Sequence, residues 1–119
     1  MRAKADVDAL VPKYKSGSEE KFALTGRAIL GDAFGVPVLA MWYEPCKWKI
    51  PGGHYTPDWM AVLDTGQVLF VEIKGSRKQK GYRDARSKLR AASEIYSIYT
   101  WCEVVEQDGW RVEVLNGSS

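Results

Sequence analysis

One segment predicts most of the architecture of this chain: residues 55–74 read Tyr-Thr-Pro-Asp-Trp-Met-Ala-Val-Leu-Asp-Thr-Gly-Gln-Val-Leu-Phe-Val-Glu-Ile-Lys. Two short runs within it, residues 59–63 and 68–73, are mostly apolar and rich in β-branched and aromatic side chains. Turn-forming residues separate the two runs, so the pattern predicts a β-hairpin. We expect a three-residue loop over residues 64–66, a type I turn closed by Gly66 in the left-handed region.

The expected register of this hairpin brings three charged residues together. Leu63 opposite Gln67 would place Asp58 opposite Glu72 on the neighbouring strand. Side chains alternate between the two faces of a strand, so Glu72 and Lys74 share one face, with Asp58 beside them. Two carboxylates and one lysine are therefore expected to converge at the end of an otherwise apolar hairpin.

Such a pair of acids is unfavourable by itself, because burial and like-charge repulsion both destabilise neighbouring carboxylates. A divalent cation would hold Asp58 and Glu72 together, and hard cations such as Mg²⁺ prefer oxygen ligands. Lys74 would then orient an attacking water or stabilise negative charge that develops on a phosphate. The alternative is an edge hairpin that carries an exposed ion pair between Glu72 and Lys74.

The two acidic motifs resemble those of a known group of nucleases. Pro57-Asp58, with Glu72-Ile73-Lys74 placed 14 residues beyond Asp58, is similar to the motif of the PD-(D/E)xK nuclease superfamily. The small phage-type, Holliday-junction-resolvase-like members are the most similar, and the resemblance extends over residues 14–114. It implies an α/β fold with a restriction-endonuclease-like core, in which helices flank a central mixed β-sheet in the order αβββαββ.

The activity that this resemblance implies is metal-dependent hydrolysis of DNA phosphodiester bonds by an endonuclease of phage recombination or repair, with branched DNA among its substrates. Asp58, Glu72 and the backbone carbonyl of Ile73 would hold Mg²⁺, for which Mn²⁺ would substitute. Lys74 would position or activate the attacking water. Cleavage of branched DNA would favour a homodimer, because cutting its two strands takes two related sites, and the sequence leaves the oligomeric state open.

A capping-box pattern from Ser16 to Glu19 and apolar residues at helical spacing predict a helix over residues 18–33. The segment Tyr14-Lys-Ser16-Gly-Ser-Glu19 is similar to the Phe-Asp-Ser-x-x-Glu pattern of small phage nucleases. This similarity implies that Glu19 contributes to catalysis and to metal binding, with Glu20 as its substitute. Glu19 also lies on the inward stripe of the expected helix. Alternatively, both acids only complement the positive end of the helix dipole.

A second helix is expected over residues 82–97, where apolar residues recur three and four apart. We expect its apolar stripe to cover the face of the second hairpin strand that carries Leu69, Val71 and Ile73. The other expected elements are a strand over residues 36–44, a loop over residues 45–54, and two strands over residues 99–106 and 109–115.

Basic residues gather between Lys74 and Arg90, where eight of them stand against a single acid, Asp84. A basic patch beside carboxylates is typical of a protein that grips a polyanion at a metal site, and a solvated helix face is the alternative. The resemblance implies that Lys88 approaches the metal site, whereas packing of its stem is the competing account. The expected nucleic-acid contacts are Arg77, Lys78, Lys80, Arg83, Arg86, Lys88, Arg90 and Trp48. For Trp48 a stacking role competes with that of a lid over the edge of the core.

The composition indicates one domain over residues 1–119, with 45% hydrophobic and 27% charged residues and a net charge of +2. Residues 1–13 are expected to form an N-terminal arm and residues 116–119 a disordered tail. No apolar run approaches the ~20 residues that a membrane span needs, and no signal peptide is evident. The cytoplasm of a bacterium or of a phage-infected host cell is therefore expected. The two cysteines and the single histidine lack the spacing of zinc ligands.

Two other classes of function stay open at this point. A non-catalytic nucleic-acid-binding module on the same fold would keep the basic face and use the acids only structurally, although carboxylates near phosphate weaken electrostatic binding. A structural subunit of a phage assembly is favoured only by the small size of the chain. The substrate also stays open among branched, flapped, single-stranded and duplex DNA, and RNA.

Overall fold

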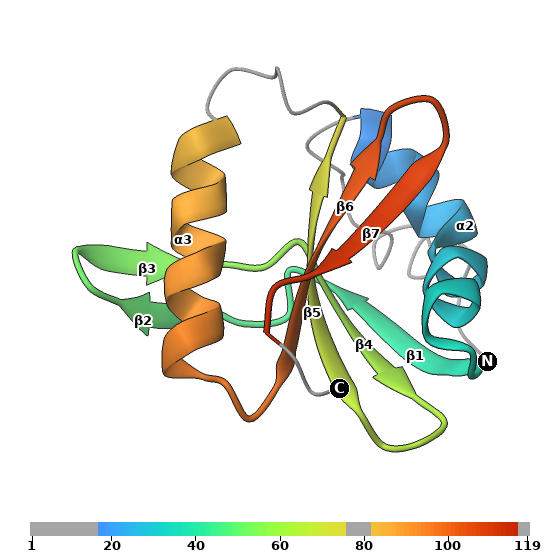
Figure 1. Ribbon diagram of the computed structural model, residues 1–119, viewed down its shortest axis with the longest axis horizontal. Coiled ribbons are helices and arrows are strands. Elements are labelled where there is room, and N and C mark those ends of the chain that lie inside the picture. Colours follow the sequence, from blue (N-terminus) through green and yellow to red (C-terminus); the bar gives the residue numbers. More distant parts are fainter. Residues whose placement is uncertain (1–16, 76–81, 117–119) are drawn as a thin grey trace, which may run out of the picture.

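The computed structural model describes residues 17–75 and 82–116. The expected N-terminal arm, the capping residue Ser16, the end of the tail and the basic residues Arg77, Lys78 and Lys80 lie outside the described residues. The described part is an α/β fold with a mixed central sheet and two helices (Figure 1). Its elements are α2 (Gly17–Phe34), β1 (Val38–Tyr43), β2 (Trp48–Ile50), β3 (Gly53–Tyr55), β4 (Trp59–Leu63), β5 (Val68–Lys74), α3 (Tyr82–Ile95), β6 (Thr100–Glu106) and β7 (Trp110–Val114).

The main sheet has five strands in the order β1-β4-β5-β6-β7. All neighbouring strands are antiparallel except β5 and β6, which are parallel. A parallel pair needs a long crossover connection, and α3 lies within the segment that joins β5 to β6. The two helices lie on opposite sides of the sheet (Figure 1). Within residues 17–75 and 82–116, no helix is long and apolar enough to cross a membrane.

The β4–β5 hairpin has the register that the sequence predicts. Trp59 pairs with Val71 and Val62 with Val68, so Leu63 stands opposite Gln67. The loop closes with a hydrogen bond of 2.9 Å from the Gly66 amide to the Leu63 carbonyl. Gly66 has a φ of 88°, a conformation that glycine adopts without steric penalty. This register carries Asp58 to the level of Glu72, which is the geometric basis of the site.

The prediction of which helix covers which face of β5 is wrong. Leu69, Val71 and Ile73 pack in a core cluster with Phe22 and Leu30 of α2. The opposite face of β5 carries Phe70, which packs in a second cluster with Leu89 and Ala92 of α3 and with Trp101 of β6. Strand periodicity defines two faces but does not say which helix covers each. Because β5 is central and buried on both faces, both helices were needed to complete the core.

The segment expected to be a loop over residues 45–54 contains a small hairpin instead. Strands β2 and β3 pair through Trp48 with Tyr55 and through Ile50 with Gly53. Three-residue strands are too short to give a period-2 pattern, which is why the sequence did not reveal them. The hairpin packs against α3, and Trp48 lies among the rings of Phe70, Tyr96, Tyr99 and Trp101, with centroid distances of 4.4 to 5.7 Å.

Candidate active site

Asp58 precedes the first residue of β4 and is buried, with 8% of its surface exposed. Its Oδ2 accepts a hydrogen bond of 2.7 Å from the backbone N–H of Ile73 on β5. Burial and then the neighbouring Glu72 charge together raise the pKa of the Asp58 carboxyl to about 9, against the opposing effect of the Ile73 hydrogen bond. Two strands therefore hold this acid in a place where its charge is unfavourable unless a cation is near.

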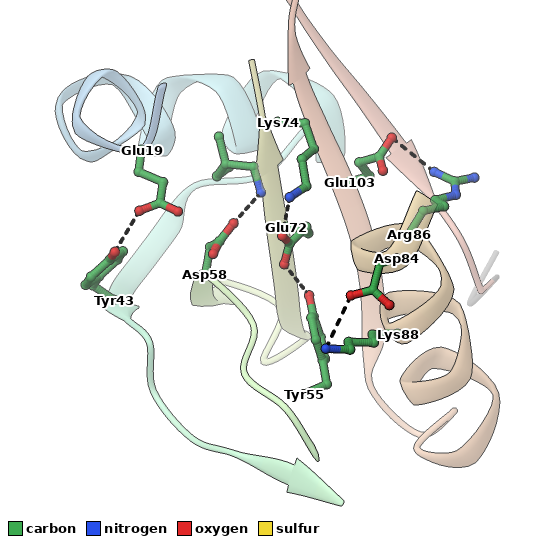
Figure 2. A network of polar contacts seen from close by, with 11 residues as sticks. Glu19, Tyr43, Tyr55, Asp58, Glu72, Lys74, Asp84, Arg86, Lys88 and Glu103 are labelled. Carbon is green, nitrogen blue, oxygen red and sulfur yellow. Dashed lines mark hydrogen bonds and ion pairs between the residues drawn. The ribbon is translucent and has the colours of Figure 1, made fainter. Parts of the chain in front are cut away.

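Glu72 lies on β5 directly across from Asp58 and is also buried, with 6% of its surface exposed. Its two carboxylate oxygens have different partners (Figure 2). The Tyr55 hydroxyl donates to Oε1 at 2.5 Å, and the Lys74 ammonium lies 3.1 Å from Oε2. Burial raises the pKa of Glu72, and the Tyr55 hydrogen bond and the Lys74 charge oppose that rise. Asp58, Glu72 and Lys74 thus meet as the sequence predicts.

The backbone of Ile73 contributes to the same place. In an antiparallel pair the N–H and C=O of one residue point toward the same neighbouring strand. Because the Ile73 N–H points to Asp58, the Ile73 carbonyl also faces the side of β4, near the point where that strand begins. Two carboxylates and one carbonyl are therefore directed to one end of the β4–β5 hairpin.

Glu19 approaches this end of the sheet from the first turn of α2. Its carboxylate is buried, with 6% of the residue exposed, and its Oε2 accepts a hydrogen bond of 2.6 Å from the Tyr43 hydroxyl on β1. Its charge contributes to the raised pKa of Asp58 and of Glu72, so it is electrostatically part of the site. Glu20 is exposed. The structure therefore favours Glu19 over Glu20, as the inward stripe of the helix predicts.

The oxygen donors of this site fit a hard cation, since carboxylates and carbonyls are the ligands that Mg²⁺ takes in proteins. In residues 17–75 and 82–116, however, no group of three or more His, Cys, Asp or Glu side chains is gathered closely enough to hold a metal ion. Glu19 thus stands at the margin of the donor set that Asp58, Glu72 and the Ile73 carbonyl form.

Of the residues expected to contact nucleic acid, some are exposed and others are held in contacts within the protein. Arg83 and Arg90 are exposed on α3. Arg86 is held 3.1 Å from Glu103 and 2.7 Å from Glu113, so it anchors α3 to β6 and β7 rather than standing ready for a phosphate. Trp48 is half-buried in the aromatic cluster described above, which indicates the lid rather than a stacking ring.

Lys88 lies away from the two acids in its described contacts. Its ammonium is 3.4 Å from Asp84, one turn earlier on α3. Both residues line a cavity of about 290 Å³ between α3 and the β2–β3 hairpin, whose hairpin wall includes Gly52 and His54. The expectation that Lys88 approaches the metal site therefore stays a prediction, because its described ion pair is with Asp84 and not with either acid of the site.

Tyr43 and Tyr55, whose hydroxyls donate to acids of the site, had no signal in the sequence analysis, and the neighbouring Glu103 had only a weak one. A tyrosine in a predicted strand or next to a glycine-rich segment is ordinary for β structure, so its hydroxyl points to no function. Glu103 is fully buried and pairs with Glu72 in the register of β5 and β6. The only available sign was a charged residue within the apolar run over residues 99–106.

No protein-family model matches this sequence, and no curated protein matches it. Among solved structures, the crystal structure of SSO0001 is similar with a TM-score of 0.41 and 19% sequence identity, over 82% of this chain and 50% of that one. The chain thus spans half the length of that protein. A similarity of this size carries no argument about function.

Proposed function

We propose that this chain is a metal-dependent endonuclease that hydrolyses DNA phosphodiester bonds, built on a restriction-endonuclease-like core of the PD-(D/E)xK kind. In chain order the helices and the strands of the main sheet run α2, β1, β4, β5, α3, β6, β7, which supports the order αβββαββ. The β2–β3 hairpin is an insertion between the first two of these strands.

One observation carries the proposal: two buried carboxylates, Asp58 and Glu72, stand side by side with Lys74 on one of them. Burial raises the pKa of both acids, so the site is held in an arrangement that disfavours its own charge. Pairs of buried acids with raised pKa values are typical of sites that bind cations or move protons.

Each residue has a distinct role in this proposal. Asp58, Glu72 and the Ile73 carbonyl would hold the cation, with Glu19 adding negative charge at the margin. A bound Mg²⁺ supplies positive charge for the scissile phosphate and lowers the pKa of a bound water. Lys74, with 16% of its side chain exposed, would donate to the attacking water or to a phosphate oxygen. Arg83 and Arg90 offer exposed charge to the DNA backbone.

The proposal includes a biological role and a class of DNA substrate. Cutting inside a DNA chain, rather than from its ends, suits a role in phage recombination or repair. Branched DNA would be a substrate for a homodimer, in which two related sites cut two strands.

A non-catalytic nucleic-acid-binding module is the second candidate. The observation in its favour is that both oxygens of Glu72 already have partners within the protein, the Tyr55 hydroxyl and the Lys74 ammonium. An acid that is satisfied in this way can persist without a cation. Such a module would bind DNA with a strong salt dependence and would cut none of it.

A cleavage panel tests the proposal against this alternative. Linear duplex, single-stranded, flapped and four-way-junction DNA would each be incubated with the protein in Mg²⁺, in Mn²⁺ or in EDTA. We expect cleavage in either metal and none in EDTA, with the preferred substrate defining the class of nuclease. Salt-sensitive binding with no cleavage of any substrate would establish the binding module instead.

Matched variants identify the residues responsible. Lys74→Ala is expected to lower the cleavage rate by about 10²- to 10⁴-fold, the range for loss of a group that assists proton transfer. Asp58→Asn is expected to lower the rate at least as much, because it removes a ligand of the cation. The controls are Asp64→Asn, in the exposed loop of the same hairpin, and Lys49→Ala, at an exposed position of β2. Equal rates for the site variants and their controls would contradict the proposed roles.

A further inference from the structure

Tyr55 ends β3 and places its phenol in the interior, where 5% of the residue is exposed. Its ring belongs to the core cluster of Phe70, Leu89 and Trp101, and its centroid lies 6.3 Å from that of Trp101. A ring packed on several sides cannot turn without opening the core. The Tyr55 hydroxyl is therefore fixed in space by packing, independently of the acid that it contacts.

The two donors to Glu72 differ in kind. The Tyr55 hydroxyl donates to Oε1 at 2.5 Å from this rigid ring, whereas Lys74 reaches Oε2 at 3.1 Å with a flexible chain (Figure 2). The hydroxyl is neutral and the ammonium is charged. Only the ammonium would compete with a cation, because like charges repel at the same carboxylate.

Carboxylates that ligate metal ions are themselves held by hydrogen bonds, and such outer partners set the orientation of the ligand. A buried hydrogen bond resists rotation of the carboxylate, because turning it would leave a buried donor without an acceptor. With Tyr55 on one oxygen, the Glu72 carboxylate has one orientation, in which Oε2 is the oxygen shared with Lys74.

We propose that Tyr55 is a positioning residue of the metal site: its hydroxyl fixes the Glu72 carboxylate through Oε1, so that Oε2 is the oxygen available to a divalent cation. Lys74 is then the exchangeable partner, which leaves Oε2 when the cation binds and becomes free to meet the phosphate or the water. This inference rests on the proposed function, because it assumes that the site binds a cation.

Metal affinity in the absence of DNA tests the inference without any need for catalysis. Free Mn²⁺ would be counted by electron paramagnetic resonance during titration of the parent chain, Tyr55→Phe, Tyr96→Phe and Lys74→Ala. Tyr96→Phe is the matched control, because that hydroxyl also donates at 2.6 Å and anchors the same hairpin, through the Lys49 carbonyl. We expect Tyr55→Phe to weaken Mn²⁺ binding by about 10- to 100-fold and Tyr96→Phe to leave it unchanged.

Lys74→Ala separates the two donors. The inference predicts that this variant binds Mn²⁺ at least as tightly as the parent, because a competing charge is gone from Oε2. The prediction also holds if Tyr55→Phe does not fold, which a melting curve of each variant would reveal. Weakening of Mn²⁺ binding by Lys74→Ala would overturn the inference, since the ammonium would then be the group that holds the ligand in place.

The remaining outcomes also decide the matter. Equal affinities of Tyr55→Phe and the parent would overturn the inference, and so would equal losses in Tyr55→Phe and Tyr96→Phe, which indicate a role in anchoring the hairpin. A parent chain that binds no Mn²⁺ would refute the metal site and the inference together. That result differs from the two outcomes above, in which the parent binds Mn²⁺ and only the role of Tyr55 is refuted. In cleavage, Tyr55→Phe is expected to need more Mn²⁺ for half-maximal rate while its KM for DNA stays that of the parent.

Discussion

Replacing Asp58 by asparagine removes a buried ionisable carboxyl and keeps the shape of the side chain. The amide oxygen can still accept the hydrogen bond that Ile73 donates at 2.7 Å. What is lost is the ionisation of a carboxyl whose pKa burial and Glu72 raise from 3.8 to about 9. In metal-free buffer above neutral pH we therefore expect Asp58→Asn to be more stable than the parent chain.

The direction in which the free energy of unfolding changes with pH follows from which state, folded or unfolded, binds the Asp58 proton. Below pH 3.8 the Asp58 carboxyl is protonated in both the folded and the unfolded chain. Between pH 3.8 and about 9 the unfolded chain has released that proton and the folded chain keeps it. Rising pH therefore favours unfolding, by at most about 1.4 kcal/mol per pH unit for one proton. From pH 6 to pH 8 the parent is expected to lose up to about 2.7 kcal/mol relative to Asp58→Asn.

Urea unfolding at a series of pH values, in EDTA and followed by tryptophan fluorescence, measures this difference. Asp64→Asn, in the exposed loop of the same hairpin, is the control and should keep the pH dependence of the parent. Saturating Mg²⁺ should stabilise the parent at pH 8 and leave Asp58→Asn unchanged, because only the charged pair gains from a cation. A free energy of unfolding for Asp58→Asn that falls with pH as steeply as that of the parent would refute the reasoning.

Three further predictions follow from other contacts. Glu19→Gln should raise the Mg²⁺ concentration needed for half-maximal rate and slow cleavage by about 10- to 100-fold, as for loss of an outer partner of a metal ligand. Glu20→Gln should cleave like the parent. Arg86→Met should lower the free energy of unfolding by about 3–5 kcal/mol in urea, because it removes an ion-pair partner of the fully buried Glu103. Trp48→Ala should destabilise by about 3 kcal/mol, the low end for an aromatic-to-alanine change, since the ring is half-buried. It should leave the affinity for DNA unchanged, and weaker DNA binding by the folded variant would indicate a base-stacking contact instead.

The hairpin could be predicted because its signals are local and agree with one another. The three-residue loop with Gly66 fixes the register, and alternation of side chains then fixes which residues share a face. That is why Asp58 and Glu72 could be placed opposite each other from the sequence. Glu19 could be preferred over Glu20 for a similar reason, since helical spacing alone separates an inward from an outward residue.

What the sequence could not provide was the choice among long-range partners. The face of β5 with Leu69 and the face with Phe70 are both apolar, so periodicity gave no preference between α2 and α3. The hydroxyl of Tyr55 and the ion pairs of Arg86 depend on contacts across 17 residues or more. Charge runs and tyrosines are common on ordinary surfaces and strands, so their particular partners appear only once the chain is folded.

We have proposed that this chain cuts DNA internally with a metal ion held by Asp58 and Glu72. Covalently closed circular DNA tests it most directly, because such a substrate has no ends for an exonuclease. We expect conversion of the circle to nicked or linear product by the parent chain in Mg²⁺, with none in EDTA and none by Asp58→Asn. An intact circle with the folded parent chain in Mg²⁺ and in Mn²⁺, or cleavage that persists in Asp58→Asn, would contradict the proposed function.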